Sequence, residues 1–263
     1  MMEMAQKADV KKNISLLQSH ETLVRLQAAE MLGKLLDPLA VKPLLALLEI
    51  EEEVKVRRAI VLSLSLLGAK EALPSLLDIL QNDPDLETRR NVAGGLRFFS
   101  EDISSQEIVE ILFQETETEI RDVLTSTLVF IRDDSIIPPL LAKFRGAAKD
   151  RHLQECCLEI IGSFNDPRAK ELLISCSSED NPESFRQIST LAMGRTDDIQ
   201  FVPHLYDIYQ QDPSEKIRDC AHQILEEISI ALNFRSIEQM VLEFKRQEQQ
   251  KQQKQQQQQT TKE

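Results

Sequence analysis

The sequence predicts an all-α solenoid, a chain of stacked helical pairs, and three observations carry this prediction. The 263 residues are rich in Leu, Ile, Val and Ala, while aromatic residues make up 5 % and Trp is absent. These aliphatic residues, with Glu, Lys, Gln and Arg, favour helices, and the hairpin dipeptides Asn-Gly and Asp-Gly do not occur. A motif also recurs at a nearly constant step of 32 residues, which is typical of repeat proteins.

The recurring motif is anchored by an arginine near the start of each unit. Steps of 32 residues connect the first four anchors, one step of 33 leads to Gln154, and two more steps of 32 complete the row. The row therefore predicts about seven helical pairs. Its arginines are Arg25, Arg57, Arg89, Arg121, Arg186 and Arg218.

The first unit, VRLQAAEMLGKLLDPLAVKPLLALL (residues 24–48), shows how one pair is built. Its apolar residues recur mostly at steps of three and four, which predicts an amphipathic helix of about four turns. Asp37-Pro38 then ends this helix and begins another, because aspartate suits a helix cap and proline suits a first turn. We expect the second helix to run from about residue 39 to 49.

Later units keep the same register. Two apolar residues, 19 and 20 positions after each anchor, are expected to face inward: Leu44-Leu45, Leu76-Leu77, Ile108-Val109, Leu140-Leu141, Leu173-Ile174 and Leu205-Tyr206. The third unit departs from the pattern, since GGLRFFSEDIS (residues 94–104) replaces its turn. Gly94-Gly95 within this unit should permit close helix packing rather than bind phosphate.

A solenoid needs closed ends, and the sequence suggests how each is formed. Residues 1–20 are expected to form an N-terminal capping helix and residues 21–245 the repeat solenoid. The last second helix should carry an apolar stripe made of Ile237, Met240, Val241 and Phe244. Residues 246–263 are Gln-rich without an apolar face, which predicts a disordered tail.

The repeat resembles the short HEAT repeats called phycobilisome-lyase-like, whose units read roughly VRxxAAxALGxLGDPxAVPxLLxxL. The resemblance covers about residues 20–230 and implies the same helical-pair solenoid. It also implies an alternative function, because HEAT-type subunits of phycobilin lyases help to attach a tetrapyrrole to a phycobiliprotein cysteine. A phycobilin lyase subunit, or a phycobilisome assembly or turnover factor, is therefore one interpretation of this chain.

Charge and hydropathy narrow the choice of partners. The net charge is −13, and such an acidic chain repels the phosphates of nucleic acids. No run of 18 apolar residues and no signal peptide is visible, so we expect a cytoplasmic protein that does not enter membranes. With nucleic acids and membranes disfavoured, we expect the partner to be another protein. The sequence does not predict the oligomeric state.

Chemistry-bearing motifs are scarce. No GxxxxGK[ST], G-x-S-x-G or HExxH motif occurs, so we assign no catalytic residue and no cofactor. The four cysteines occupy positions where the repeat has small apolar residues, which indicates reduced core residues. A zinc site is the disfavoured alternative, and its ligands would be Cys176, Cys220, His204 and His222, with Cys156 and Cys157 left in the core.

The arginine row has two interpretations. Each arginine can tie neighbouring units together by donating hydrogen bonds to turn carbonyls and to acidic caps, or the row can bind phosphate groups. Acidic residues near the anchors favour the first interpretation, a structural ladder. These residues are Glu21, Glu53, Asp85, Glu87, Glu119, Asp122, Glu215 and Asp219.

Candidate partner-binding residues lie beyond the inward pairs. In such solenoids the second helices line a concave face, and Asp78, Glu110 and Asp207 stand 21 residues after their anchors. We expect this acidic row to attract a basic segment of a partner. Lys143 and Arg145 form a contrasting basic stretch, expected in the link between the fourth and fifth units. The leading functional prediction is a non-catalytic interaction scaffold or adaptor.

Overall fold

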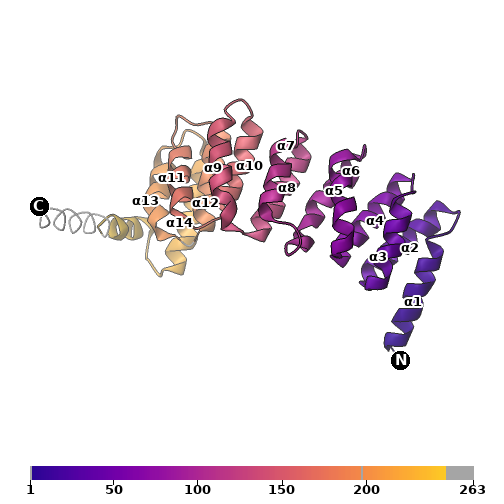
Figure 1. Ribbon diagram of the computed structural model, residues 1–263. Helices are drawn as coiled ribbons and strands as arrows, with labels where there is room; N and C mark the ends of the chain where they lie inside the picture. The colour runs from indigo at the N-terminus through magenta and orange to yellow at the C-terminus, as the bar shows by residue number, and fades with distance from the viewer. Residues whose placement is uncertain (1, 197, 247–263) are drawn as a thin grey trace, which may run out of the picture. The chain divides into compact units, whose positions relative to one another are not determined.

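The computed structural model describes residues 2–196 and 198–246, with side chains from Lys7 onward. Helices joined by short turns make up this part of the chain, and no strand occurs in it. The predicted all-α solenoid is confirmed, and Figure 1 shows the succession of helices. Two compact units are formed, the first ending at Ile136 and the second beginning at Ile137. The Gln-rich tract from residue 247 lies outside the described residues, so the division at 20 and 245 stays a prediction.

The first unit contains α1 and then alternating first and second helices of the repeats. Its elements are α1 (Met2–Leu16), α2 (Thr22–Leu35), η1 (Pro38–Ala40), α3 (Val41–Leu48), α4 (Val54–Leu67), η2 (Lys70–Ala72), α5 (Leu73–Asn82), α6 (Leu86–Gly95), η3 (Leu96–Phe99), α7 (Ser105–Gln114), α8 (Thr118–Ile131) and η4 (Asp134–Ile136). The first helices α2, α4, α6 and α8 stack in that order, and each second helix packs on the next first helix.

Small residues allow these first helices to approach closely. A Cβ on Gly33 would lie 2.4 Å from Oγ of Ser63, and a Cβ on Gly95 would lie 2.3 Å from Oγ of Ser65. Ser63 donates a 2.8 Å hydrogen bond to the backbone oxygen of Ala29 on the neighbouring helix. The prediction of close packing at Gly94-Gly95 therefore holds for Gly95, since a Cβ on Gly94 would make an ordinary 3.4 Å contact.

The turns inside the repeats follow the predicted cap chemistry. The Asp37 carboxylate accepts a 2.9 Å hydrogen bond from the backbone N–H of Leu39, and Pro38 occupies the first turn of η1. The second helix begins at Val41 after this short 3₁₀ turn, two residues later than predicted. In the third repeat the chain continues into η3, and Ser104 then starts α7 with a capping box to Glu107.

The second unit repeats the alternation. Its elements are α9 (Ile137–Gly146), α10 (Arg151–Gly162), α11 (Pro167–Cys176), α12 (Glu183–Arg195), η5 (Ile199–Phe201), α13 (Val202–Gln211), α14 (Glu215–Ala231) and a helix that runs from residue 237 to the last described residue, 246. The first helices α10, α12 and α14 stack, while α9, α11 and α13 pack on α10, α12 and α14 respectively.

The core of the second unit lies between these two rows of helices. Leu158, Leu173, Leu205 and Leu225 are fully buried in it, and Met240 on the last helix closes it. The predicted apolar stripe on this last helix is therefore present. None of the helices in the described part of the chain is long and apolar enough to span a membrane.

The predicted inward pairs hold for their first members. Leu44, Leu76, Ile108, Leu140, Leu173 and Leu205 are all buried. The prediction is wrong for Ile174, whose side chain is 37 % exposed. Ile174 follows Leu173 by one residue, a rotation of about 100° on a helix, and it turns away from the core toward the space beside α13.

Candidate protein-binding surface

The arginine row ties successive repeats together through carboxylates that lie 26 residues further along the chain. The Nε and Nη2 atoms of Arg25 donate to the two oxygens of Glu51 at 2.7 and 2.8 Å. Arg57 donates in the same way to Asp83 at 3.2 and 3.3 Å. Arg89 pairs with Glu115, and Arg186 donates to Asp212 at 2.9 and 3.2 Å. Each pair joins a first helix to the loop that follows the next second helix.

Each of these carboxylates also holds the start of the following first helix. It accepts a hydrogen bond from the backbone N–H two residues later, at 3.1 Å for Glu51, 2.8 Å for Asp83, 2.9 Å for Glu115 and 2.8 Å for Asp212. The arginines complete the junction by donating to backbone oxygens of the preceding loop, as Arg186 does to Asn181 at 2.8 Å. One side chain therefore fixes two consecutive repeats.

The carboxylate side chains at these junctions are buried. The Glu51 side chain is 3 % exposed and the Asp212 side chain 2 %. The hydrogen bonds from Arg25 lower the pKa of Glu51, and the pair raises the pKa of Arg25. Burial acts to raise the pKa of Glu115, but the Glu117 N–H and Arg89 outweigh it, so the pKa is lowered. All these carboxylates are engaged inside the protein and are poor ligands for a partner.

The structural interpretation of the arginine row is supported by this geometry. The four paired carboxylates precede the cap of the next first helix by two residues, and they are not among the acids near the anchors that favoured this interpretation. The sequence signal for these pairs is a carboxylate 26 residues after four of the six arginine anchors. Arg121 and Arg218 donate to the backbone oxygens of Glu115 and Asp212, at 2.7 and 2.6 Å.

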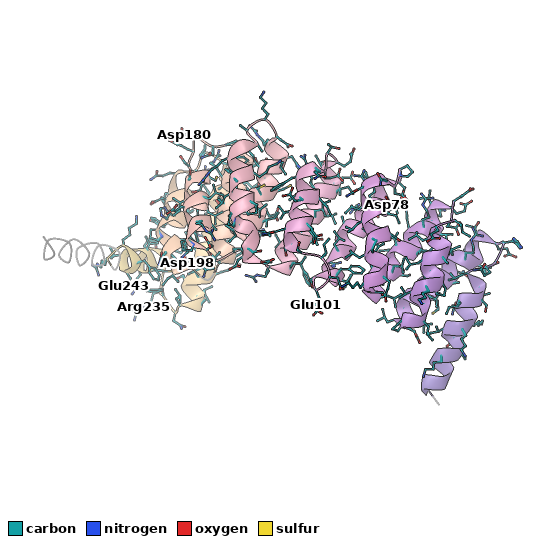
Figure 2. All side chains as sticks on the ribbon, in the orientation of Figure 1. Asp78, Glu101, Asp180, Asp198, Arg235 and Glu243 are labelled. Carbon is teal, nitrogen blue, oxygen red and sulfur yellow. The ribbon has the colours of Figure 1, made fainter. Side chains whose placement is uncertain are left out.

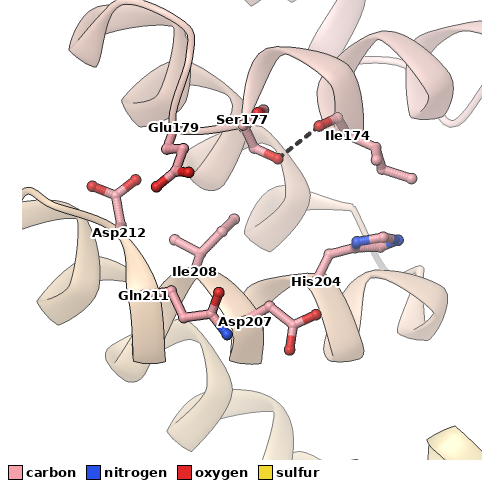
Figure 3. A pocket seen from close by; sticks show the side chains of 9 residues that line it. Ile174, Ser177, Glu179, His204, Asp207, Ile208, Gln211 and Asp212 are labelled. Carbon is pink, nitrogen blue, oxygen red and sulfur yellow. Dashed lines mark hydrogen bonds between the residues drawn. The ribbon is translucent and has the colours of Figure 1, made fainter.

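An open notch lies between the second helices α11 and α13 of the second unit. It has a volume of about 310 Å³ and is lined by Ile174, Ser177, Ser178, Glu179, His204, Asp207, Ile208, Gln211 and Asp212. Figure 3 shows Asp207, Gln211 and His204 on one wall and Glu179, Ser177 and Ile174 on the other. The notch is acidic with an apolar floor at Ile208, which suits the aliphatic stem and cationic head of a lysine or arginine.

The charges of the notch are not equally available. Asp212 is engaged by Arg186 from the core side, so its charge is balanced within the protein. Glu179 and Asp207 are exposed, and Asp207 faces Lys245 of the last helix at 3.5 Å. Lys245 is itself 45 % exposed and lies 5.7 Å from the ring centroid of Tyr206. A pair this exposed is weak, so an incoming cation can replace Lys245 beside Asp207.

A second notch occupies the equivalent place in the first unit, between α5 and α7. Its volume is about 400 Å³, and its lining consists of Leu80, Gln81, Arg89, Ile111, Gln114, Glu115 and Thr116. Both notches lie near the ends of two second helices, and each is lined by the carboxylate of a paired arginine, Asp212 or Glu115. Close stacking of the first helices and wider separation of the second helices account for this repetition.

The predicted acidic row is only partly associated with these notches. Asp207 lines the α11–α13 notch, but Asp78 and Glu110 do not line the α5–α7 notch. Both are exposed, on α5 and α7 respectively, and Asp78, marked in Figure 2, accepts a 2.8 Å hydrogen bond from Asn82. Glu179 was not predicted, because it follows the end of α11 and lies outside the helical register.

The basic stretch is placed differently from the prediction. Lys143 and Arg145 belong to the last turn of α9 rather than to a link between repeats. A basic last turn is favourable at a helix C-terminus, because cations there offset the exposed backbone oxygens. Arg145 is exposed and Lys143 is half-buried.

The four residues of the disfavoured zinc alternative are distributed over α11, α13 and α14. The structure does not bring any three of their ligand atoms together among the residues that it describes. Cys176 lies in the core, where burial raises the pKa of its thiol to about 11. His222 packs against Tyr209, with ring centroids 4.8 Å apart. These contacts are those of packing residues.

Three comparisons with known proteins were informative to different degrees. Residues 10–97 match the family model of HEAT repeats. No curated protein shows a significant match. Among solved structures, the chain is similar to a chain in the complex of CpcE and CpcF of phycocyanin lyase from Nostoc sp. PCC7120. The identity is 20 %, the TM-score is 0.47, and the match covers 89 % of this chain and 92 % of that one.

Proposed function

We propose that this protein is a non-catalytic interaction scaffold that binds a basic segment of a partner protein on the face formed by its second helices. HEAT repeats provide the coarse part of this proposal, because stacked helical pairs present extended surfaces to other proteins. The finer part concerns the α11–α13 notch. A partner lysine or arginine would enter it between Glu179 and Asp207.

The observation that carries the proposal is the combination of open volume and available negative charge in this notch. The nearby Asp212 is neutralised from inside by Arg186, while Glu179 and Asp207 remain exposed to solvent. Exposed charges of this kind accelerate encounter with an oppositely charged partner and select against like-charged ones. The net charge of −13 acts in the same direction over a longer range.

Photo-crosslinking from the notch tests the proposal in cells of the native host. A photo-reactive amino acid placed at Gln211 would face a partner in the notch, and the same residue placed at the exposed Gln223 of α14 serves as the matched control. We expect a discrete adduct from Gln211 and none from Gln223. Mass spectrometry should find lysine or arginine in the crosslinked peptide.

Two variants then test the role of charge. Glu179→Gln with Asp207→Asn should weaken the adduct strongly, whereas Lys245→Ala should strengthen it, because Lys245 competes for Asp207. Opposite effects of the two changes would be hard to explain by altered folding, since all three side chains are exposed. An adduct of unchanged yield in both variants, or one whose peptide lacks basic residues, would disprove the proposal.

A further inference from the structure

The first unit carries an exposed apolar row that the fold does not require. Nine residues after the anchors, at the ends of the first helices, stand Lys34, Leu66, Phe98, Phe130, Ser163 and Arg195. Three consecutive members are large and apolar, and they are 48 %, 45 % and 66 % exposed for Leu66, Phe98 and Phe130. Leu62, one turn before Leu66 on α4, is 45 % exposed as well. We call these four side chains the apolar patch.

The segment η3 lies between the two sides of the patch. η3 packs against both α4 and α8, and the backbone oxygen of Phe98 lies 3.2 Å from the Cβ position of Gly68 at the end of α4. Arg97 joins the two aromatic rings, since its guanidinium carbon lies 5.3 Å from the ring centroid of Phe98 and 5.9 Å from that of Phe130. The loop after η3 contains Glu101, which is marked in Figure 2.

Packing within the first unit does not explain these side chains. The adjacent Phe99 is 1 % exposed and fills the core below η3, so the local structure is already held. Single exposed apolar residues are common, but three at one register position on neighbouring helices form a patch of the kind found at interaction sites. Aromatic residues and arginine are also the types most enriched where binding energy is concentrated.

Arg97 defines the charge of the partner. Within the described residues it forms no ion pair, although acidic residues outnumber basic ones by 44 to 31 in this chain. Its exposed guanidinium keeps its hydrogen-bond donors for a carboxylate supplied from outside. The rings on either side would exclude water from such a contact and strengthen it.

We propose that the apolar patch with Arg97 is a second docking surface, which binds a peptide segment carrying a carboxylate beside large apolar side chains. This partner chemistry is opposite in charge to that proposed for the α11–α13 notch. The two surfaces lie in different units, and each is testable without the other. The net charge of −13 argues against an anionic membrane as the occupant of the patch.

Selection from a displayed library of random 16-residue peptides tests this proposal on the full chain. Peptides are selected on the unmodified protein and counter-selected on the Phe98→Ala, Phe130→Ala variant. A Leu23→Ala, Ile50→Ala variant is the matched control, because both residues are exposed apolar side chains outside the patch. Circular dichroism of each variant confirms that the helices are retained.

We expect enriched peptides that combine aspartate or glutamate with leucine or phenylalanine. Their affinity should fall by about tenfold or more in the double phenylalanine variant and should be unchanged in the control. Arg97→Gln should weaken binding several-fold, chiefly at low salt, because the carboxylate contact is electrostatic. The Glu179→Gln, Asp207→Asn variant should bind these peptides normally, which separates this proposal from the first.

Other outcomes would overturn the proposal. These are the absence of enriched peptides, enriched peptides without acidic residues, and peptides that bind the double phenylalanine variant equally well. Co-flotation of the protein with phosphatidylcholine–phosphatidylserine vesicles that depends on Phe98 and Phe130 would identify a membrane surface instead. A dimer in analytical ultracentrifugation that is abolished by the same two substitutions would identify a second copy of this chain as the occupant.

Discussion

Replacing Arg186 by methionine should strongly destabilise the second unit. Methionine keeps much of the aliphatic stem but removes two hydrogen bonds to Asp212, at 2.9 and 3.2 Å, and one to the Asn181 backbone oxygen at 2.8 Å. The Asp212 side chain is 2 % exposed, so its carboxylate would be left buried without its cation. Breaking a buried pair in this way costs about 3 to 5 kcal/mol. With a urea dependence of about 2 kcal/mol per molar, the unfolding midpoint should fall by roughly 2 M.

Tyrosine fluorescence makes this measurement specific to the second unit. The protein has two tyrosines and no tryptophan, and Tyr206 and Tyr209 both lie on α13. Arg168→Met provides the control, because the Arg168 side chain is 51 % exposed in its pair with Asp166. Exposed pairs contribute about 0 to 1 kcal/mol, so this midpoint should move little. If Arg186→Met costs less than about 1 kcal/mol, or no more than the control, the argument from burial is refuted.

Three further predictions concern the first unit and the alternative function. Arg25 lowers the pKa of Glu51, so the stability from this pair is present above the ordinary glutamate pKa and is lost as the pH falls through the lowered value. The difference in thermal midpoint between the unmodified protein and Glu51→Gln should therefore narrow below about pH 4.5 and stay constant above it. Gly95→Ala should destabilise the protein by about 1 to 3 kcal/mol in urea unfolding, because the added Cβ would meet Ser65. The adjacent Gly94→Ala should be nearly neutral or stabilising. Equal effects of the two substitutions would contradict the close-packing argument. Incubation with phycocyanobilin and an apo-phycobiliprotein should give no more coloured covalent adduct than a protein-free control, and a faster reaction would favour the phycobilin lyase alternative.

The sequence predicts the helices well because their signals are local. Apolar spacing, the Asp37-Pro38 break and the 32-residue step depend on neighbouring residues along one chain segment. Contacts between repeats are harder to predict from the sequence, because the 32-residue step does not fix the direction in which a side chain points. The repeat step alone therefore does not identify Glu51, Asp83, Glu115 and Asp212 as the partners of the ladder, whereas a carboxylate 26 residues after an arginine anchor does.

The candidate sites depend on features that lie between helices. The position of Asp207 in the repeat predicts that it is a candidate binding residue. The notch that it lines forms because first helices pack closely while second helices are further apart. Phe98 lies in GGLRFFSEDIS, which replaces the turn of the third unit, so the repeat pattern does not predict its exposure. Phe98 is exposed because the adjacent Phe99 takes the core position, which a single residue of rotation in η3 decides.

The paired arginine and carboxylate also constrain the number of residues between them. Where an anchor and its acid are separated by 26 residues, one inserted residue would rotate the second helix by about 100° and carry the carboxylate away from its arginine. Insertions and deletions should therefore be tolerated poorly inside these intervals. The only 33-residue step in the row, from Arg121 to Gln154, falls in an interval where position 26 is Ala147. Repeats could be lost or duplicated as whole 32-residue modules, because an arginine and its carboxylate, 26 residues apart, both lie within one step of the row.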